Sequence, residues 1–343
     1  MAAAAPGAPP TKAEPWTPEA LPDLSGVVAV VTGANSGLGF HTALELARHG
    51  AHVVLAARDP GRGDLALGQV RVQAPGASAE LRQLDLADLA SVRAFADGLL
   101  EGTGRVDVLV NNAGVMAVPR RLTEDGFELQ LGTNHLGHFA LTGLLLPALL
   151  TGSVLGGPAR VVTVSSMLHR RGRLHRDDLM GERRYTPYGA YGQSKLANLL
   201  FTYELQRRID SAGLSARLAS LASHPGYAAT NLQAVGPQMT GSSLQARLGA
   251  IGNRFLAQSA AQGAWPSLRA AGDPAARGGE FYGPGGFADM RGNPRPVTPA
   301  EHALDTSDAA WLWERSVELT GVGYAPLNAV TEALNTVNDV EES

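Results

Sequence analysis

The amino-acid sequence predicts a single doubly wound α/β domain with a parallel central sheet. Segments of strand character alternate with segments of helical character along most of the chain, without an internal repeat or a change in composition. The first strand-like segment, residues 27–31, is a continuous apolar run, as expected of a strand buried on both faces. A glycine-rich turn then leads directly into a helix. These observations place the domain at residues 24–330.

Each further element is predicted from its local pattern. Six more strands follow residues 27–31, at 52–57, 79–84, 106–110, 160–164, 216–222 and, as a short last strand, 280–282. The predicted helices are 37–50, 59–73, 88–101, 139–150, 190–209 and 258–271, with Gly50 as the C-cap of the first. Two long segments, 167–189 and 233–257, interrupt the alternation. Long connections at the carboxyl ends of strands usually build the ligand site of such a domain.

Composition excludes several kinds of function. The chain has no cysteine, which excludes disulfides, thiolate catalysis and cysteine-ligated metals. The net charge of -4 provides no basic field that would attract nucleic acid or an anionic membrane. No stretch of about 20 apolar residues is present to span a bilayer, and residues 1–23 lack the pattern of a secretory signal. We therefore expect a cytoplasmic protein with a disordered tail at 1–23, a frayed acidic tail at 331–343, and no nucleic-acid or metal partner.

The glycine-rich turn reads Thr-Gly-Ala-Asn-Ser-Gly-Leu-Gly over residues 32–39. Glycine suits this turn because the backbone must bend sharply, approach a pyrophosphate closely and let the helix pack on the strand. The helix then offers free N–H groups and the positive end of its dipole to the phosphates. The alternative is a glycine-rich turn without a ligand. The residues predicted to bind phosphate are Gly33, Asn35, Ser36, Gly37, Leu38 and Gly39.

Tyr191 and Lys195 lie four residues apart in a predicted helix and therefore share one face of it. A free phenol, with a pKa of about 10, is a poor acid–base catalyst at neutral pH. A fixed ammonium group and a cationic nicotinamide ring beside it favour the phenolate and lower that pKa. Combined with the phosphate-binding turn, the pair indicates a nicotinamide-dependent oxidoreductase. Tyr188 is a second candidate, but it lacks the lysine partner because position 192 is glycine.

Arg58 determines which nucleotide is expected. An acidic side chain at the tip of the second strand would bind the adenosine ribose hydroxyls, but Ala57 holds that position. The guanidinium group of Arg58, the next residue, is instead well shaped for a 2′-phosphate. We therefore expect NADP(H) in preference to NAD(H). The alternative is that Arg58 is a solvated loop residue paired with Asp59.

Two strand ends and one helix carry further polar residues. The Asn-Asn-Ala-Gly sequence at 111–114 ends the fourth strand with residues that bond a neighbouring backbone and leave room for a flat cofactor. Ser165 and Ser166 close the fifth strand, where a hydroxyl can donate to a substrate carbonyl oxygen. A capping or turn role is favoured for Ser165. Asn134 can bind a water within a helix, but its residue type alone favours a helix N-cap.

Taken in order, T-G-x-x-x-G-x-G, N-N-A-G, N-H, V-S-S, Y-x-x-x-K and the His-Pro-Gly at 224–226 resemble the short-chain dehydrogenase/reductase family over about residues 24–285. Segments 160–169 and 194–198 are most similar to its retinol dehydrogenase-like and WW-domain oxidoreductase-like subgroup. The resemblance implies a Rossmann fold with a seven-stranded parallel sheet. It also implies a homodimer paired through helices at 136–150 and 190–209. Apolar residues available for dimer contacts, or equally for the core, are Leu199, Leu200 and Tyr203.

By motif match, the resemblance implies a catalytic tetrad. Tyr191 would protonate the carbonyl oxygen in reduction, and Lys195 would bond the nicotinamide ribose and tune Tyr191. Ser166 would orient the carbonyl group, and Asn134 would hold a relay water. Further cofactor contacts are implied at three places: Asp85 and the backbone of Leu86 near adenine, Asn112 with Ala113 and Gly114 against the adenosine ribose, and Thr230 with Pro225 and Gly226 at the carboxamide.

The chain departs from the family pattern between Ser166 and Tyr191, where the gap is longer than in many family members. The extra residues include a basic insertion at 169–176, expected to be a solvated loop or else a site that meets an acidic substrate. Vertebrate retinol dehydrogenases have membrane anchors, and none is expected here. Retinol is therefore not carried over as the substrate.

The leading interpretation is hydride transfer between NADP(H) and a carbonyl or alcohol compound. Reduction of a carbon–carbon double bond, as in the protochlorophyllide reductase branch, and a non-catalytic NADP(H) sensor or scaffold are the alternatives. Within 233–257, apolar residues at helical spacing predict an amphipathic lid over the nicotinamide end: Leu244, Leu248, Ile251 and Phe255. An apolar lid favours a bulky, apolar substrate, although these residues are equally suited to packing the lid on the sheet.

Overall fold

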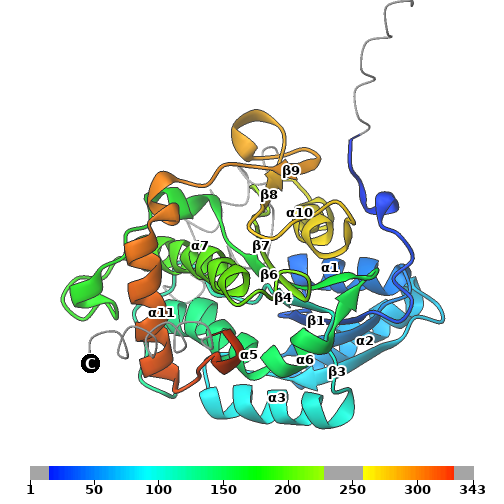
Figure 1. Cartoon of the computed structure of the whole chain (residues 1–343), viewed down its shortest axis with the longest axis horizontal. Coiled ribbons are helices and arrows are strands. Elements are labelled where there is room, and N and C mark those ends of the chain that lie inside the picture. Colours follow the sequence, from blue (N-terminus) through cyan, green and yellow to red (C-terminus); the bar gives the residue numbers. More distant parts are fainter. Residues whose placement is uncertain (1–14, 228–257, 328–343) are drawn as a thin grey trace, which may run out of the picture.

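Seven parallel strands form the central sheet in the order β3-β2-β1-β4-β6-β7-β8 (Figure 1). The computed structural model describes residues 15–227 and 258–327. In it these strands are β1 Val28–Thr32, β2 His52–Ala57, β3 Ala79–Gln83, β4 Val108–Asn111, β6 Gly157–Val164, β7 Leu218–Ser223 and β8 Phe281–Pro284. From β1 the chain builds outward to β2 and β3, then returns to add β4 on the other side. Ligands bind at such a switch point in doubly wound sheets.

Two short antiparallel strands bring the sheet to nine strands in the described part of the chain, rather than the seven predicted. β5 Ser153–Val154 pairs with β6, and β9 Pro294–Pro296 pairs with β8. Runs of two and three residues show no periodicity, and proline is unusual in strands except at their edges. The sequence pattern therefore predicts the parallel strands but not these additions.

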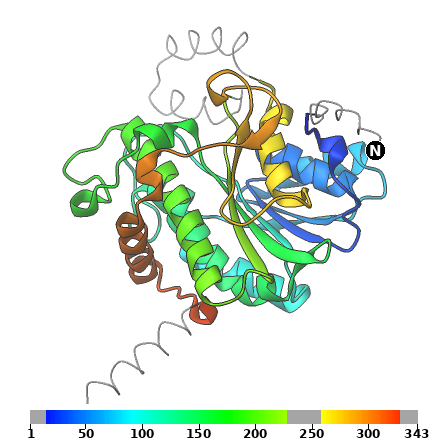
Figure 2. The ribbon, with the colours of Figure 1, turned by 45° about the horizontal axis from the view of Figure 1, so that its top comes forward.

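Helices cover both faces of the sheet (Figures 1 and 2). One face packs against α1 Gly37–Arg48, α2 Pro60–Gln73 and α10 Ala260–Gly272. The other packs against α3 Leu89–Gly102, α5 Gly137–Leu144, α6 Leu146–Thr151 and α7 Pro187–Ser211. The central strands are buried on both sides as predicted, and Val30 and Val31 are 0% exposed. Among the described residues, no helix is both long and apolar enough to span a membrane.

The chain segment 15–23 packs on the domain, although the sequence places it in a disordered tail. A 3-10 turn, Pro18–Ala20, precedes Leu21, which is buried in the core between α1 and α10. The side-chain amide of Asn293 donates to the backbone oxygen of Trp16 at 2.9 Å. Isolated apolar residues in an Ala- and Pro-rich segment carry no helix or strand signal, so this packing was not predicted. Residues 1–14 and the predicted acidic tail at 331–343 lie outside the described residues.

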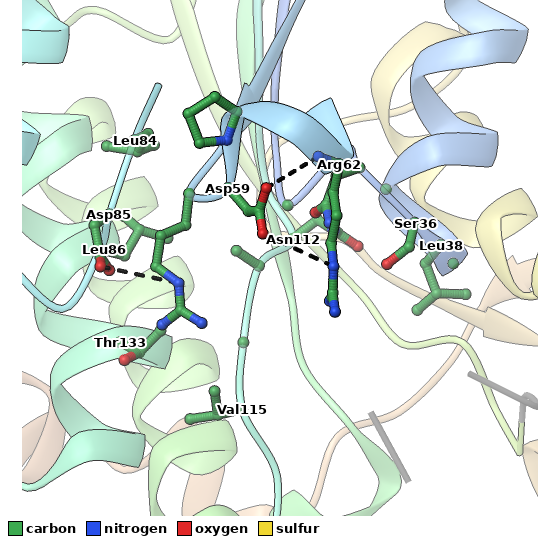
Figure 3. A pocket seen from close by; sticks show the side chains of 18 residues that line it. Ser36, Leu38, Asp59, Arg62, Leu84, Asp85, Leu86, Asn112, Val115 and Thr133 are labelled. Carbon is green, nitrogen blue, oxygen red and sulfur yellow. Dashed lines mark hydrogen bonds and ion pairs between the residues drawn. The ribbon is translucent and has the colours of Figure 1, made fainter. Parts of the chain in front are cut away.

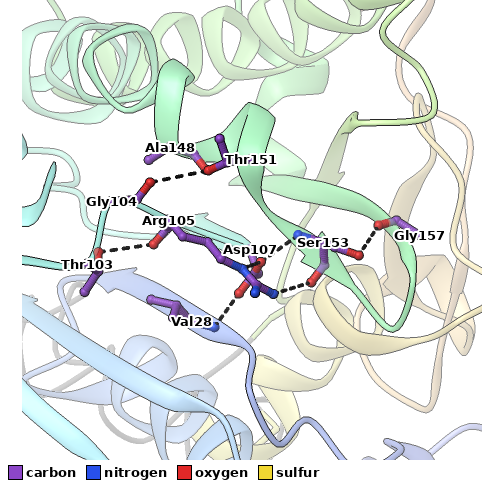
Figure 4. Close-up of polar contacts among 9 residues, drawn as sticks. All are labelled: Val28, Thr103, Gly104, Arg105, Asp107, Ala148, Thr151, Ser153 and Gly157. Atoms are coloured by element: carbon purple, nitrogen blue, oxygen red, sulfur yellow. Dashed lines mark hydrogen bonds and ion pairs between the residues drawn. The ribbon is translucent and has the colours of Figure 1, made fainter.

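A buried carboxylate fixes the amino-terminal edge of the sheet, opposite the predicted site (Figure 4). Asp107 is 0% exposed and stands just before β4. Its Oδ2 accepts from the backbone N–H of Val28 at 2.7 Å, at the start of β1. Its Oδ1 accepts from Arg105 Nε and from the backbone N–H of Ser153, both at 2.6 Å. One charged group thus holds together the starts of β1, β4 and β5, with each oxygen hydrogen-bonded as a buried charge requires.

The basic insertion is largely exposed, as expected of a solvated loop, but two of its arginines, Arg170 and Arg176, bind a later part of the chain. Arg170 donates to Asp289 at 3.4 Å and to the backbone oxygen of Thr298 at 3.1 Å. Arg176 binds Asp308 at 2.6 Å. Buried His169 accepts from the backbone N–H of Ala300 at 3.1 Å. The insertion therefore serves as a docking surface for residues 289–308 of the same chain.

The C-terminal helix α11, Thr306–Thr320, covers α7 on the side away from the sheet (Figure 1). Leu199 and Leu200, offered above as dimer contacts, are 0% exposed and lie in a core cluster that also contains Leu312 of α11. The structure therefore uses these residues in the core. A dimer would have to use surface other than these side chains.

Candidate active site

A cavity of about 740 Å³ opens at the carboxyl ends of β1, β2 and β4, at the switch point (Figure 3). Most residues predicted to contact a cofactor line it: Gly33, Asn35, Ser36, Gly37, Leu38, Gly39, Arg58, Asp85, Leu86, Asn112, Ala113 and Gly114. The lining also includes Asp59, Pro60, Arg62, Leu84, Val115 and Thr133. The structure therefore brings the glycine turn, the second strand tip and the Asn-Asn-Ala-Gly turn together around one space.

The glycine turn has the geometry that a phosphate group needs. Gly33 and Gly37 have φ values of +66° and +56°, which side chains other than glycine rarely adopt. A Cβ atom added to Gly39 would lie 2.5 Å from both Asn112 Nδ2 and the backbone oxygen of Gly33. The helix α1 begins at Gly37, and its N-cap Ser36 makes no side-chain capping bond. The positive end of the α1 dipole therefore lies at the cavity, where it fits a pyrophosphate.

Two arginines stand at the second strand tip. Arg58 is 71% exposed, with its Nε 4.0 Å from Asp85 Oδ2. Arg62, which the sequence analysis missed, is 76% exposed with its Nε 3.9 Å from Asp59 Oδ2 (Figure 3). The backbone N–H of Arg62 donates to Asp59 Oδ1 at 3.0 Å, so Asp59 is the N-cap of α2. The signal was available, because a basic residue in the first turn after this cap must lie at the same strand tip.

Asn112 lines the cavity and also bonds a neighbouring backbone, as expected for the turn at 111–114. Its side-chain Nδ2 donates to the backbone oxygen of Thr32 at 2.7 Å. The backbone N–H groups of Asn112 and Ala113 both donate to Thr32 Oγ1, at 2.9 and 3.0 Å. Asn112 lines the cavity, but its amide is used to fix the turn after β4 to the end of β1. Asn112, Ala113 and Gly114 together line this side of the cavity.

Tyr191 and Lys195 project from one face of α7 and are 4% and 3% exposed. The Nζ of Lys195 lies 5.8 Å from the centre of the Tyr191 ring and donates to the backbone oxygen of Val164 at 2.9 Å. Ser166, at the end of β6, lies near enough to the Tyr191 hydroxyl to lower its pKa. The structure therefore groups three of the four predicted catalytic residues. Ser165 instead donates to the backbone oxygen of Lys195 at 2.8 Å, a structural role that ties β6 to α7 and differs from the capping or turn role favoured for it.

Burial shifts both titrating groups towards their neutral forms. It raises the pKa of Tyr191 to about 12, against a smaller lowering by Ser166. It lowers the pKa of Lys195 to about 8. The expected lowering of the phenol pKa is thus not found in this state, because desolvation of the phenolate outweighs the influence of Ser166. At neutral pH Tyr191 holds its proton and most Lys195 is charged.

Asn134 lies in a π-helical turn, Gly132–Leu136, between the short helix α4, Leu129–Leu131, and α5. It is not an N-cap. Its Oδ1 accepts from the backbone N–H of Val115 at 2.8 Å, and its Nδ2 donates to the backbone oxygen of Val115 and to Ser194 Oγ, both at 2.9 Å. The sequence analysis did not predict this turn, because a π-helical turn has no simple sequence signature. The helix predicted at 139–150 is preceded by the turn and is divided into α5 and α6.

Gly114 connects the cavity to the catalytic group. It lines the cavity, and a Cβ atom on it would lie 2.9 Å from Asn134 Oδ1 and 3.7 Å from Lys195 Nζ. A long ligand lying along the cavity from the glycine turn would therefore end beside Lys195. Any side chain at position 114 would fill this passage.

The remaining predicted residues lie elsewhere or outside the described chain. Pro225 and Gly226 do not line the cavity; Gly226 has a φ of +64°, and its turn packs against the backbone of Met290. Tyr188 is 65% exposed, which argues against it as the proton donor. Thr230 and the predicted lid helix lie outside the described residues. No group of three potential metal-binding side chains occurs within the described parts of the chain.

Comparisons with known proteins agree with this geometry. The model of the "short chain dehydrogenase" family matches residues 27–239. Retinol dehydrogenase 12 of Homo sapiens is 42% identical over 301 residues, 88% of this chain and 88% of that protein. Retinol dehydrogenase 11 of Homo sapiens is 46% identical over 209 residues, 61% of this chain and 63% of that protein.

Solved structures extend the similarity to the fold. The crystal structure of an uncharacterised protein from Mycobacterium Paratuberculosis is 46% identical, with a TM-score of 0.73, and covers 90% of this chain and 99% of its own. A structure described as an NAD(P)-dependent gluconate 5-dehydrogenase from Beutenbergia cavernae, with bound NADP, is 29% identical with a TM-score of 0.58. That match covers 76% of this chain and 95% of the other.

Proposed function

Because the chain belongs to the short chain dehydrogenase family and is an oxidoreductase of the retinol dehydrogenase-like subgroup, we propose that it reduces carbonyl compounds with NADPH, or runs the reverse reaction, using Tyr191 as acid and base. The observation that carries this proposal is the buried contact of Tyr191 with Ser166, with Lys195 Nζ 5.8 Å from the ring centre. The group stands at the end of a cavity that fits a dinucleotide. A binding protein without catalysis has no use for such a group.

The residues divide the reaction as follows. When bound, the nicotinamide cofactor supplies or accepts the hydride. The Tyr191 hydroxyl gives its proton to the carbonyl oxygen as that oxygen gains negative charge, and the Ser166 hydroxyl donates a hydrogen bond to the same oxygen. Lys195, held at the backbone oxygen of Val164, keeps a positive charge beside the phenolate that remains. Asn134 holds the turn at Val115 in place.

The preference for NADP(H) is supported by Arg58 and Arg62. Both guanidinium groups line the cavity and are largely exposed to it and to solvent, so neither is already used by a buried partner. A 2′-phosphate at the second strand tip would lie between them, whereas the Asp59 carboxylate is used as a helix cap. Two positive side chains and no free acid at this position favour the phosphorylated nucleotide.

A bulky, apolar carbonyl compound is the proposed substrate class. The names of the relatives, retinol dehydrogenases 11 and 12, refer to a long apolar alcohol. The test is NADPH oxidation with all-trans-retinal, a steroid ketone and phenanthrenequinone, each compared with acetone and glucose. We expect a higher kcat/KM for the large apolar group. NADPH binding without turnover of any carbonyl would instead support the sensor alternative, and a preference for acetone or glucose would contradict the proposed substrate class.

A further inference from the structure

Gln130 is a fully buried amide whose three hydrogen bonds join separate segments of the chain. It is 0% exposed. Its Oε1 accepts from the backbone N–H of Ala117 at 2.8 Å. Its Nε2 donates to the hydroxyl of Tyr185 and to the backbone oxygen of Pro187, both at 2.9 Å. The amide is thus satisfied on both ends, and its loss would remove a hydrogen-bond partner from the half-buried backbone groups of Ala117 and Pro187.

The joined segments are those that carry the catalytic residues. Gln130 itself stands four residues before Asn134, at the start of the π-helical turn. Ala117 belongs to the loop after β4, close to Val115, whose backbone holds the Asn134 side chain. Pro187 is the first residue of α7, one helical turn before Tyr191. One side chain therefore connects the Asn134 turn, the cavity wall and the Tyr191 helix.

The loop at Ala117 needs a stabilising hydrogen bond from another segment of the chain. Ala117 has a φ of +52°, a conformation that costs an L residue other than glycine about 1 kcal/mol or more. The Gln130 oxygen binds the N–H of this residue and so helps to hold the strained turn. Tyr185, in the long segment 167–189 before α7, adds a second hydrogen bond by donating to the backbone oxygen of Val118 at 2.8 Å. The segment 167–189 thus also helps to hold the loop at Ala117.

We propose that Gln130 is a positioning residue that fixes the Tyr191 helix relative to the Asn134 turn, and so sets the distance from the phenol to the reacting carbonyl. This rests on the proposed function. Gln130 does not line the cavity, so its effect should fall on the chemical step and not on nucleotide binding. A misplacement of about 1 Å at a reacting group can cost about 100-fold in rate.

Two variants separate the bonds. Gln130→Met keeps the length of the side chain and removes all three bonds, whereas Gln130→Glu keeps the acceptor for Ala117 and removes both donors, including the tie to Pro187 of α7. For both we expect kcat for NADPH-dependent reduction of phenanthrenequinone to fall about 10- to 100-fold. NADPH affinity, measured by the fluorescence of the bound nucleotide, should stay within about twofold. If either variant fails to fold, Tyr185→Phe, which removes one hydroxyl, should lower kcat about threefold or more.

Gln193→Met is the matched control. Gln193 is also buried. Its amide donates to the backbone oxygen of Leu179 at 2.9 Å and accepts from the N–H of His175 at 3.0 Å. It therefore connects only the segment 167–189 to α7. The Gln193→Met variant should lower the melting temperature to a similar extent and leave kcat within about twofold.

The proposal is overturned if Gln130→Met keeps the wild-type kcat, if Gln130→Glu alone keeps it, or if Gln193→Met loses as much kcat as Gln130→Met. A wild type without turnover would refute the proposed function as well; active wild type with unaffected variants refutes only this inference.

Discussion

At the scale of single residues, burial acts on Tyr191 and Lys195 in opposite directions. It raises the phenol pKa to about 12 and lowers the ammonium pKa to about 8, since each loses the hydration of its charged form. Near neutral pH the pair therefore holds one proton to give and one positive charge to stabilise what remains. This is the state that carbonyl reduction needs.

The pH dependence of reduction should follow Lys195. Tyr191 stays protonated well above neutral pH, so the group that titrates first is the Lys195 ammonium, which loses its proton as the pH rises through about 8. We expect kcat/KM for reduction to be level below that pH and to decline above it, because kcat/KM reports groups of the enzyme before substrate binds. A pH series from 6 to 10, with Lys195→Met as the control, measures this. A level profile to pH 10 would contradict the assignment.

Cofactor preference should depend on both arginines at the second strand tip. Loss of a charge-assisted bond costs about 1.5–3 kcal/mol, so Arg58→Ala and Arg62→Ala should each weaken NADPH binding about 10-fold or more and leave NADH nearly unchanged. Arg71→Ala is the control, because Arg71 is exposed on α2, the helix that carries Arg62, and does not line the cavity. Nucleotide titrations give the ratio of the two dissociation constants. An unchanged ratio in both variants would exclude these residues as the 2′-phosphate site.

Single residues differ in how far the sequence could predict them. The grouping of Tyr191, Lys195 and Ser166 was predicted, the first two from their spacing on one helix face and Ser166 from its strand end and the family resemblance, and their catalytic roles stay predictions. Gln130 and Asn134 were not predicted in their actual roles, since their partners come from segments far apart in the sequence. Local pattern contains no information about such tertiary hydrogen bonds.

At the scale of elements, the packing of α1 on the glycine turn should control cofactor binding. A methyl group at position 39 would meet Asn112 and Gly33 at 2.5 Å, so Gly39→Ala must push α1 away from the turn. We expect NADPH affinity to fall more than about 10-fold, with a lower melting temperature. In α2, Gly68→Ala meets nothing within 4 Å and should raise stability by about 0.5–1 kcal/mol without affecting binding. Equal NADPH affinity in both variants would show that the close contact is not needed.

Several regular elements were predicted nearly to their ends, whereas two additions to the sheet and one helical turn were not. The strand at 52–57 and the helix at 59–73 agree with β2 and α2 to within one residue. The strands β5 and β9 were missed because two or three residues are too few to show alternation, and the π-helical turn was missed because it has no simple sequence signature. The predicted lid helix lies outside the described residues and stays a prediction.

At the scale of the whole molecule, α11 should be essential to stability. Trp313 is 3% exposed, and its ring lies 4.6 Å from Tyr324 and 5.2 Å from Phe139, between centroids. Trp313→Ala should lower the free energy of unfolding by about 3–5 kcal/mol, measured by urea denaturation. Trp311→Ala, at a half-buried position on the same helix, should cost much less. Similar losses in the two variants would mean that α11 is not held by this aromatic cluster.

The overall architecture followed from the sequence, whereas the docking of its C-terminal part did not. The alternating apolar segments and the ordered motifs sufficed for the doubly wound sheet and for membership of the family. The contacts of Arg170 and Arg176 with residues beyond 288 were not predicted, since charge alone does not reveal its partner. The cytoplasmic location and a homodimer stay predictions, the latter now limited to surface not used by the core between α7 and α11.

The most direct test of the account is turnover by Tyr191→Phe, measured together with NADPH binding. The substitution removes one hydroxyl near Ser166 and leaves the lining of the nucleotide cavity intact. Loss of the proton donor typically costs about 100- to 10,000-fold. We predict that wild type oxidises NADPH with phenanthrenequinone or all-trans-retinal, and that the variant binds NADPH normally but loses at least about 100-fold in kcat. A variant that turns over near the wild-type rate would contradict the assignment of Tyr191 as the catalytic acid.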